Sequence, residues 1–150
     1  MDVPELTDAL VHHFLEKEYD KHAADLIGLD MAFKRGGEII GFALCPDKTE
    51  DMAYLGAFEA AVMHVIDARH KLGKEIKLAL AIAFGSTAEG ASPSYRRALK
   101  KYSNSIVFED LGLSLYLVTG REALIVLLPT EINPFLRNLN EWIAQRKSLS

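Results

Sequence analysis

The stretch GGEIIGFALCPDK, residues 36–48, decides how this chain folds, because it joins a turn to an apolar strand. The adjacent glycines Gly36 and Gly37 accept positive φ without strain, so the segment KRGG predicts a hairpin turn. The strand EIIGFALC, residues 38–45, is apolar on both faces, which is typical of a strand between two covering layers. We therefore expect this strand to lie inside a sheet with helices on both sides.

The residues before this strand predict a helix and the other strand of the hairpin. Apolar residues recur at helical spacing from Val3 to Phe14, after Asp2, which can cap the helix. DLIGLDMAF, residues 25–33, alternates as a half-buried strand does, with one face formed by Ile27, Leu29, Met31 and Phe33.

The residues after it predict a second helix, a central strand and a mixed C-terminal part. Thr49 can cap a helix whose buried stripe is Leu55, Phe58, Val62, Val65 and Ile66. EIKLALAIAF, residues 75–84, is the clearest strand, and its alanine face lets a helix approach closely. Further on we expect a helix at 93–102, short strands at 105–110, 113–119 and 122–129, and a last helix opened by Pro134. This order predicts one α/β domain over residues 1–150, with a mixed sheet and with residues 121–147 as an appendage.

Composition places the chain among ordinary soluble proteins. Of its 150 residues 49% are hydrophobic and 25% charged, and no apolar run approaches the roughly 18 residues that span a bilayer. The acidic N-terminus lacks the features of a signal peptide, so we expect a cytoplasmic protein without a membrane partner. Cys45 is the only cysteine, which excludes an intrachain disulfide and a cysteine-based zinc site.

Three stretches resemble the restriction-endonuclease-like fold of the PD-(D/E)XK nuclease superfamily, over about residues 3–119. AADLIGL, residues 23–29, is similar to the family's strand that opens with an aspartate, and GEIIGFALC is similar to the next strand, which carries a glutamate and a lysine. The third stretch runs from LALAIAF through SYRRALKKY to LYLV, residues 78–118, with its turn at Gly112. The resemblance implies a three-layer domain with a mixed central sheet flanked by helices.

The same resemblance places the family's catalytic positions on residues that cannot serve them. Asp25 matches the aspartate, whereas the glutamate position falls on Ala43 and the lysine position on Cys45. Such nucleases hold a hard divalent cation between carboxylates, and alanine and a thiol are no substitute. The resemblance thus implies a degenerate active site without a cofactor, in which Asp25 is the one metal-ligand candidate, and a binding or assembly role.

Two other functions compete with this interpretation. One is a magnesium-dependent nuclease with a rearranged site that combines Asp25 with some of the neighbouring charged residues Asp30, Glu38, Asp47 and Lys48. The other is a small-ligand or nucleotide binder that uses the loop at residues 85–92, between a strand and a helix.

Two kinds of partner follow from the sequence. Nucleic acid would meet Arg96, Arg97, Lys100 and Lys101, which share a helical face, although the net charge of −4 does not favour it. A second copy is the other partner, because the C-terminal strands carry few charges and the last of them is expected at an edge. We therefore expect a homodimer.

Overall fold

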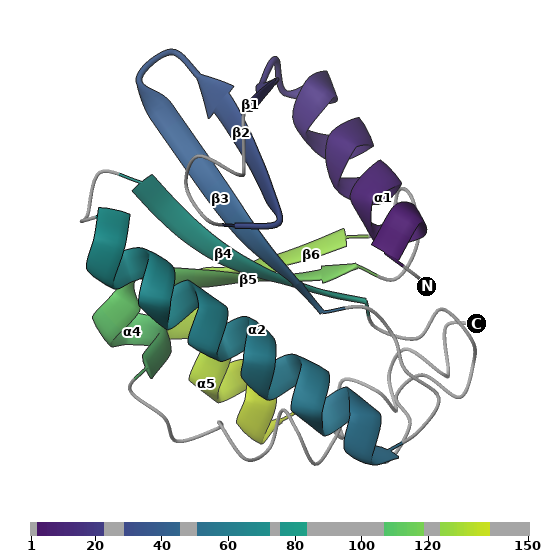
Figure 1. The fold of residues 1–150 in the computed structure, drawn as a ribbon, viewed down its shortest axis with the longest axis vertical. Coiled ribbons are helices and arrows are strands. Elements are labelled where there is room, and N and C mark those ends of the chain that lie inside the picture. Colours follow the sequence, from purple (N-terminus) through teal and green to yellow (C-terminus); the bar gives the residue numbers. More distant parts are fainter. Residues whose placement is uncertain are drawn as a thin grey trace.

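A computed structural model describes the protein over residues 3–22, 29–45, 51–72, 76–83, 107–118 and 124–138. The chain alternates helices and strands in an order close to the predicted one (Figure 1). The elements are α1 (Val3–Glu16), β1 (Asp20–His22), β2 (Met31–Arg35), β3 (Glu38–Cys45), α2 (Asp51–Leu72), β4 (Ile76–Ala83), α4 (Val107–Leu111), β5 (Leu113–Val118), β6 (Leu124–Leu127) and α5 (Pro129–Arg137).

The strands form one six-stranded sheet in the order β1-β2-β3-β4-β5-β6. The pairs at its two ends, β1–β2–β3 and β5–β6, are antiparallel, whereas β3, β4 and β5 run parallel. Arg35 pairs with Glu38, so Gly36 and Gly37 form the two-residue loop, and Gly36 has a φ of 60°. The hairpin, the mixed sheet and the central place of β4 are thus confirmed.

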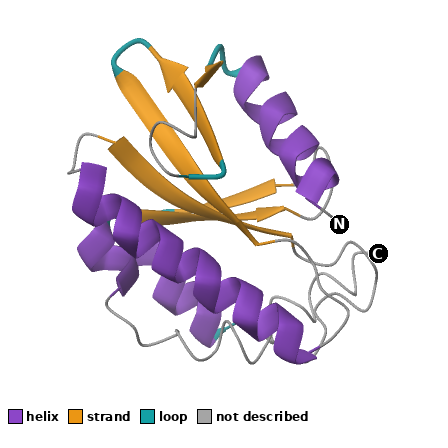
Figure 2. Cartoon of the chain, in the orientation of Figure 1, coloured by secondary structure: helices purple, strands orange, loops and turns teal. Residues whose placement is uncertain are grey.

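Helices cover both faces of this sheet (Figure 2). On one face Leu78, Leu80 and Ile82 of β4 share an apolar cluster with α2, α4 and α5. On the other face Ala79 and Ala81 belong to a second cluster, which contains the buried side of α1. The small alanine side chains leave room for the aromatic rings of this second cluster. The α/β class with helices on both sides of the sheet is therefore as expected.

Aromatic rings hold α1 on the sheet. Phe14 stacks on Phe33 of β2 with ring centroids 4.5 Å apart, and it forms an edge-to-face pair with Phe42 of β3, with centroids 5.4 Å apart. Phe42 in turn meets Tyr116 of β5 edge-on at 4.9 Å. Burial raises the pKa of Tyr116 to about 12, because the phenolate would lose its hydration there. Phe14 also packs against Tyr116, with ring centroids 5.8 Å apart, so this one residue of α1 contacts three strands.

The aromatic cluster also predicts how stability depends on pH. His13 packs edge-on against Tyr116 at 6.2 Å, and burial, followed by the charge of Lys17, lowers the pKa of His13 below 6.5. The unfolded chain therefore binds this proton more tightly than the folded one. We expect the contribution of His13 to the free energy of unfolding to be complete above about pH 6.5 and to be lost as the pH falls from there towards the folded pKa.

Urea denaturation at a series of pH values from neutral to mildly acidic would measure this loss. The His13→Gln variant is expected to have a flatter profile than the wild type in the same window. Equal slopes for the two proteins would contradict the assignment to His13.

The sequence predicted a strand at SIVFED, residues 105–110, but residues 107–111 form the short helix α4, and residues 105–106 lie outside the described ranges. β5 already occupies the place beside β4 in the sheet. Phe108 instead enters the core cluster next to α2 and α5. Helix α4 ends at Leu111 and is followed by Gly112, whose φ of 62° suits glycine and whose N–H donates to the carbonyl of Glu109 at 3.1 Å.

The strand expected at residues 25–33 begins only at Met31, and residues 25–28 lie outside the described part of the chain. Leu29 packs in the cluster on the α2 face, whereas Met31 and Phe33 belong to the α1 face. A bend at residues 29–30 breaks the alternation, so the prediction that Leu29 shares a face with Phe33 is wrong. The short polar strand β1 was not predicted, because DKH carries no apolar alternation.

The last helix begins at Pro129, five residues before the predicted start at Pro134, which lies inside it. Leu128 N–H donates to Oε1 of Glu131 at 2.9 Å, and Glu131 N–H donates to the Leu128 carbonyl at 2.8 Å. These two hydrogen bonds satisfy backbone donors at the start of the helix, and Pro129 occupies the first helical position, where proline is well tolerated. Ile132 of α5 and Leu127 of β6 join the core cluster beside α2, so these elements extend the same core.

Candidate functional site

The two positions at which the resemblance places catalytic residues lie in the core. Ala43 and Cys45 of β3 have no exposed surface, and both belong to the apolar cluster that includes Val62 and Val65 of α2. Since residues two apart on a strand share a face, both side chains lie on the side that α2 covers. Neither side chain offers an oxygen ligand. Asp25, Asp47 and Lys48 lie outside the described residues.

Asp30 lies at the carboxyl end of β3. Its Oδ2 accepts a hydrogen bond from Leu44 N–H at 2.9 Å, and its own N–H donates to the Phe42 carbonyl at 3.0 Å. The carboxylate therefore continues the pairing of β2 and β3 at the bend where β2 begins. This is a turn role of the kind that short acidic side chains commonly fill.

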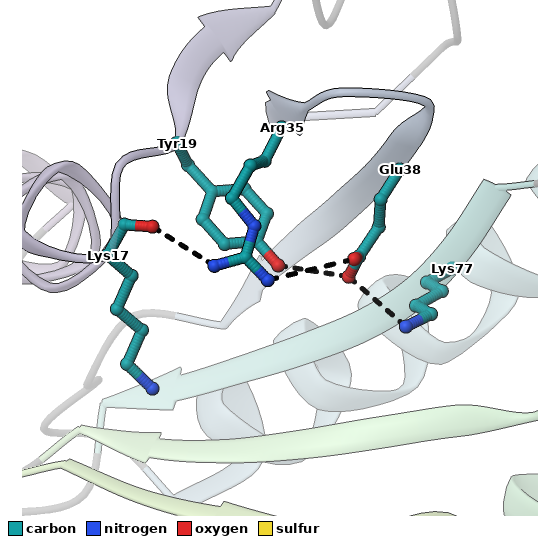
Figure 3. A network of polar contacts seen from close by, with 5 residues as sticks. All are labelled: Lys17, Tyr19, Arg35, Glu38 and Lys77. Carbon is teal, nitrogen blue, oxygen red and sulfur yellow. Dashed lines mark hydrogen bonds and ion pairs between the residues drawn. The ribbon is translucent and has the colours of Figure 1, made fainter.

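Glu38 lies at the opposite end of β3, at the centre of a polar network (Figure 3). Its Oε1 accepts hydrogen bonds from Tyr19 Oη at 2.9 Å and from Lys77 Nζ at 3.1 Å. Glu38 and Leu44 are separated by about 20 Å along a strand that rises about 3.3 Å per residue. Asp30, which binds Leu44, and Glu38 therefore cannot hold one metal ion together.

The network joins three parts of the fold. Arg35 lies over the ring of Tyr19, with its Cζ 4.4 Å from the centroid, and Nη1 donates to the Lys17 carbonyl at 3.1 Å. The hydrogen bonds from Lys77 and Tyr19 lower the pKa of Glu38, whereas burial and the bond to Glu38 raise the pKa of Tyr19. The end of α1, the β2–β3 hairpin and the start of β4 are linked in this way. Because the Lys77 side chain is 66% exposed, this ion pair contributes little stability.

A cavity of about 370 Å³ opens where the end of α2, the start of β4 and α4 meet, and it is lined by Arg69, Lys77, Glu109, Asp110, Leu111 and Gly112. Arg69 fixes its wall, because Nε donates to the Leu111 carbonyl at 3.1 Å and Nη1 to the Ile76 carbonyl at 3.0 Å. Burial lowers the pKa of Arg69. The lining combines two cations with two carboxylates, so its charge does not select an ion of either sign. Arg69 was not predicted as a site residue, because no spacing in the sequence links it to Leu111 or Ile76.

The structure does not describe the other predicted sites, which are the loop at 85–92 and the basic residues Arg96, Arg97, Lys100 and Lys101. Within the described ranges, no group of three or more His, Cys, Asp or Glu side chains is placed to hold a metal ion. Among the helices that the structure describes, none combines the length and the hydropathy of a membrane-spanning segment.

Fold and geometry together define an α/β protein with an open, mixed, six-stranded sheet. Compared with protein-family models, with curated proteins and with solved structures, the chain shows no match to any of the three.

Proposed function

We propose that this protein is a non-catalytic domain of the restriction-endonuclease-like kind, with a role in binding or assembly. The observation that carries the proposal is the burial of Ala43 and Cys45 beneath α2. The divalent metal ions that support phosphodiester hydrolysis require oxygen ligands. The lysine position requires a positively charged side chain that reaches the reacting phosphate. An alanine and a buried thiol supply neither.

The arrangement of the sheet supports the proposal. The resemblance rests on an order of hairpin, helix and strand that the residue patterns predict, and β2, β3, α2 and β4 have this order, with β4 parallel to β3. Of the carboxylates proposed for the rearranged nuclease, the two that the structure describes argue against it, because Asp30 and Glu38 lie at opposite ends of β3 and already bind protein donors.

We expect the purified protein to cleave neither single-stranded, double-stranded nor branched DNA in the presence of Mg²⁺ or Mn²⁺. The reason is that, in this proposal, no two carboxylates hold one divalent cation between them, so no metal-activated water forms beside the phosphate. Gel assays of labelled substrates over long incubations would measure the cleavage. Any cleavage observed should be tested with Asp25→Ala and Asp30→Ala, and with Asp67→Ala, an exposed carboxylate on α2, as the matched control. Cleavage that Asp25→Ala or Asp30→Ala abolishes and Asp67→Ala preserves would overturn the proposal in favour of the nuclease.

The binding role has two candidate partners. Nucleic acid would be held through phosphate contacts by Arg96, Arg97, Lys100 and Lys101, and its affinity would then fall steeply with salt. A second copy of the chain is the partner that the uncharged C-terminal strands favour, whereas the net charge of −4 disfavours nucleic acid.

A further inference from the structure

The outer edge of β6 is the feature from which this inference starts. β6 is the last strand of the sheet, and among the described residues it pairs only with β5. The N–H groups and carbonyls on the outer edge of such a strand are a template for another strand. The template ends at Leu127, because Leu128 N–H already donates to Glu131.

Among the described residues, no charged side chain and no proline lies within this edge strand. Proteins commonly guard an edge strand with lysine, proline or a charge that points inward. β6 has the sequence LIVL, and the chain holds no charged residue between Glu122 and Glu131. Val126 is 38% exposed, and Leu128, which follows the strand directly, is 56% exposed. Apolar side chains are therefore accessible beside an open row of backbone groups.

A second copy of this chain fits the edge better than a charged partner does. Two copies with a net charge of −4 repel each other, so they associate best where neither carries a charge. An uncharged apolar strand is also complementary to itself, as a twofold interface requires. We propose that β6 pairs antiparallel with β6 of a second copy, across a twofold axis at Val126. This inference rests on the proposed assembly role.

The geometry of the sheet fixes the register of this pairing. A twofold axis perpendicular to the sheet keeps each face of one copy on the same side as that face of the other. Leu124 packs against the α1-face cluster, and Val126 pairs with Tyr116 of that cluster, so both share a face. With the axis at Val126, this residue meets its own symmetry mate, and Leu124 comes next to the exposed Leu128. The accessible apolar side chains thereby cover one another.

A cysteine at the axis tests this register directly. Opposed residues of an antiparallel pair have Cα atoms about 4.5–5.5 Å apart, which is within the range that a disulfide bridges. We expect Val126→Cys to form, on mild oxidation, a reducible species of twice the 16.6 kDa chain mass. Met63→Cys is the matched control, because Met63 is 55% exposed on α2, away from this edge. Met63→Cys should form no disulfide-linked species under the same oxidation and at the same protein concentration. Cys45 is buried in both variants.

A charge at the axis provides a second test that does not depend on disulfide chemistry. In Val126→Lys two ammonium groups would meet across the axis. We therefore expect the dimer dissociation constant measured by sedimentation equilibrium to rise about tenfold or more, with an unchanged circular dichroism spectrum. A wild type that sediments as one chain would overturn both this inference and self-assembly. A dimer that Val126→Lys leaves intact and Val126→Cys does not crosslink would overturn the β6 edge alone and leave the assembly role standing.

Discussion

Replacement of Ala43 by glutamate is expected to lower the free energy of unfolding by about 3–5 kcal/mol, because it forces a carboxylate into the apolar core. The nuclease superfamily that the sequence resembles carries a glutamate at the corresponding position, so the variant introduces that residue. Ala43 has no exposed surface, pairs with Leu80 of β4 and lies in the cluster with Val62 of α2. The carboxylate would have to remain ionised without hydration or become protonated. Chemical denaturation followed by circular dichroism would measure the loss.

Two controls separate the cost of burying a carboxylate from the effect of an exposed charge and from that of a small buried polar group. Met63→Glu adds the same charge on the exposed side of α2 and should change stability by less than about 0.5 kcal/mol. Ala43→Ser adds one buried hydroxyl and should cost about 1–3 kcal/mol. Wild-type stability for Ala43→Glu, or its stabilisation by Mg²⁺, would contradict the burial of this position and support the nuclease.

Phe14→Ala is expected to cost a comparable 3–5 kcal/mol, in this case by removing the side chain that docks α1. Phe14 is 3% exposed and contacts Phe33, Phe42, Tyr19 and Tyr116. Its removal leaves a cavity between a helix and three strands, and aromatic pairs are lost in addition to the apolar contact. The free energy of unfolding in urea would report the loss. Protection of α1 amides in hydrogen exchange should fall with it.

Leu15→Ala is the matched control for this prediction. Leu15 is the next residue of the same helix and is 50% exposed, so alanine is introduced beside Phe14 without loss of the core contact. We expect the Leu15→Ala change to stay below about 1 kcal/mol. A loss for Phe14→Ala as small as that for Leu15→Ala would contradict the docking of α1 through this side chain.

Strong periodic patterns predicted most of the sheet. The alternation of leucine and alanine in β4 predicted a central strand with two different faces, and each face is buried against a different set of helices. The pair Gly36 and Gly37 predicted the hairpin because few other residues accept the turn. These features depend on local chemistry, which a sequence states directly.

The features that sequence did not predict depend on contacts between distant residues. Residues 107–111 contain strand-forming side chains, yet β5 takes the neighbouring place in the sheet and leaves them to form α4. Asp30 reaches Leu44 across the bend, and Arg69 binds the carbonyls of Leu111 and Ile76, although no spacing in the sequence links these residues. For the candidate site, the sequence alone showed that Ala43 and Cys45 stand where the resemblance places a glutamate and a lysine. Their burial beneath α2 required the fold.

The parallel pairing of β3 with β4 has a consequence for synthesis of the chain. Ile39 pairs with Ile76, so the ribosome must complete all of α2 before β3 acquires its second neighbour. Until then a strand that is apolar on both faces has one open edge, which is a hazard for aggregation in a nascent chain. The hairpin with β2 closes early because its loop is short, whereas the step that protects β3 waits for a long loop closure. The slow step in the folding of this domain is therefore expected to be the arrival of β4.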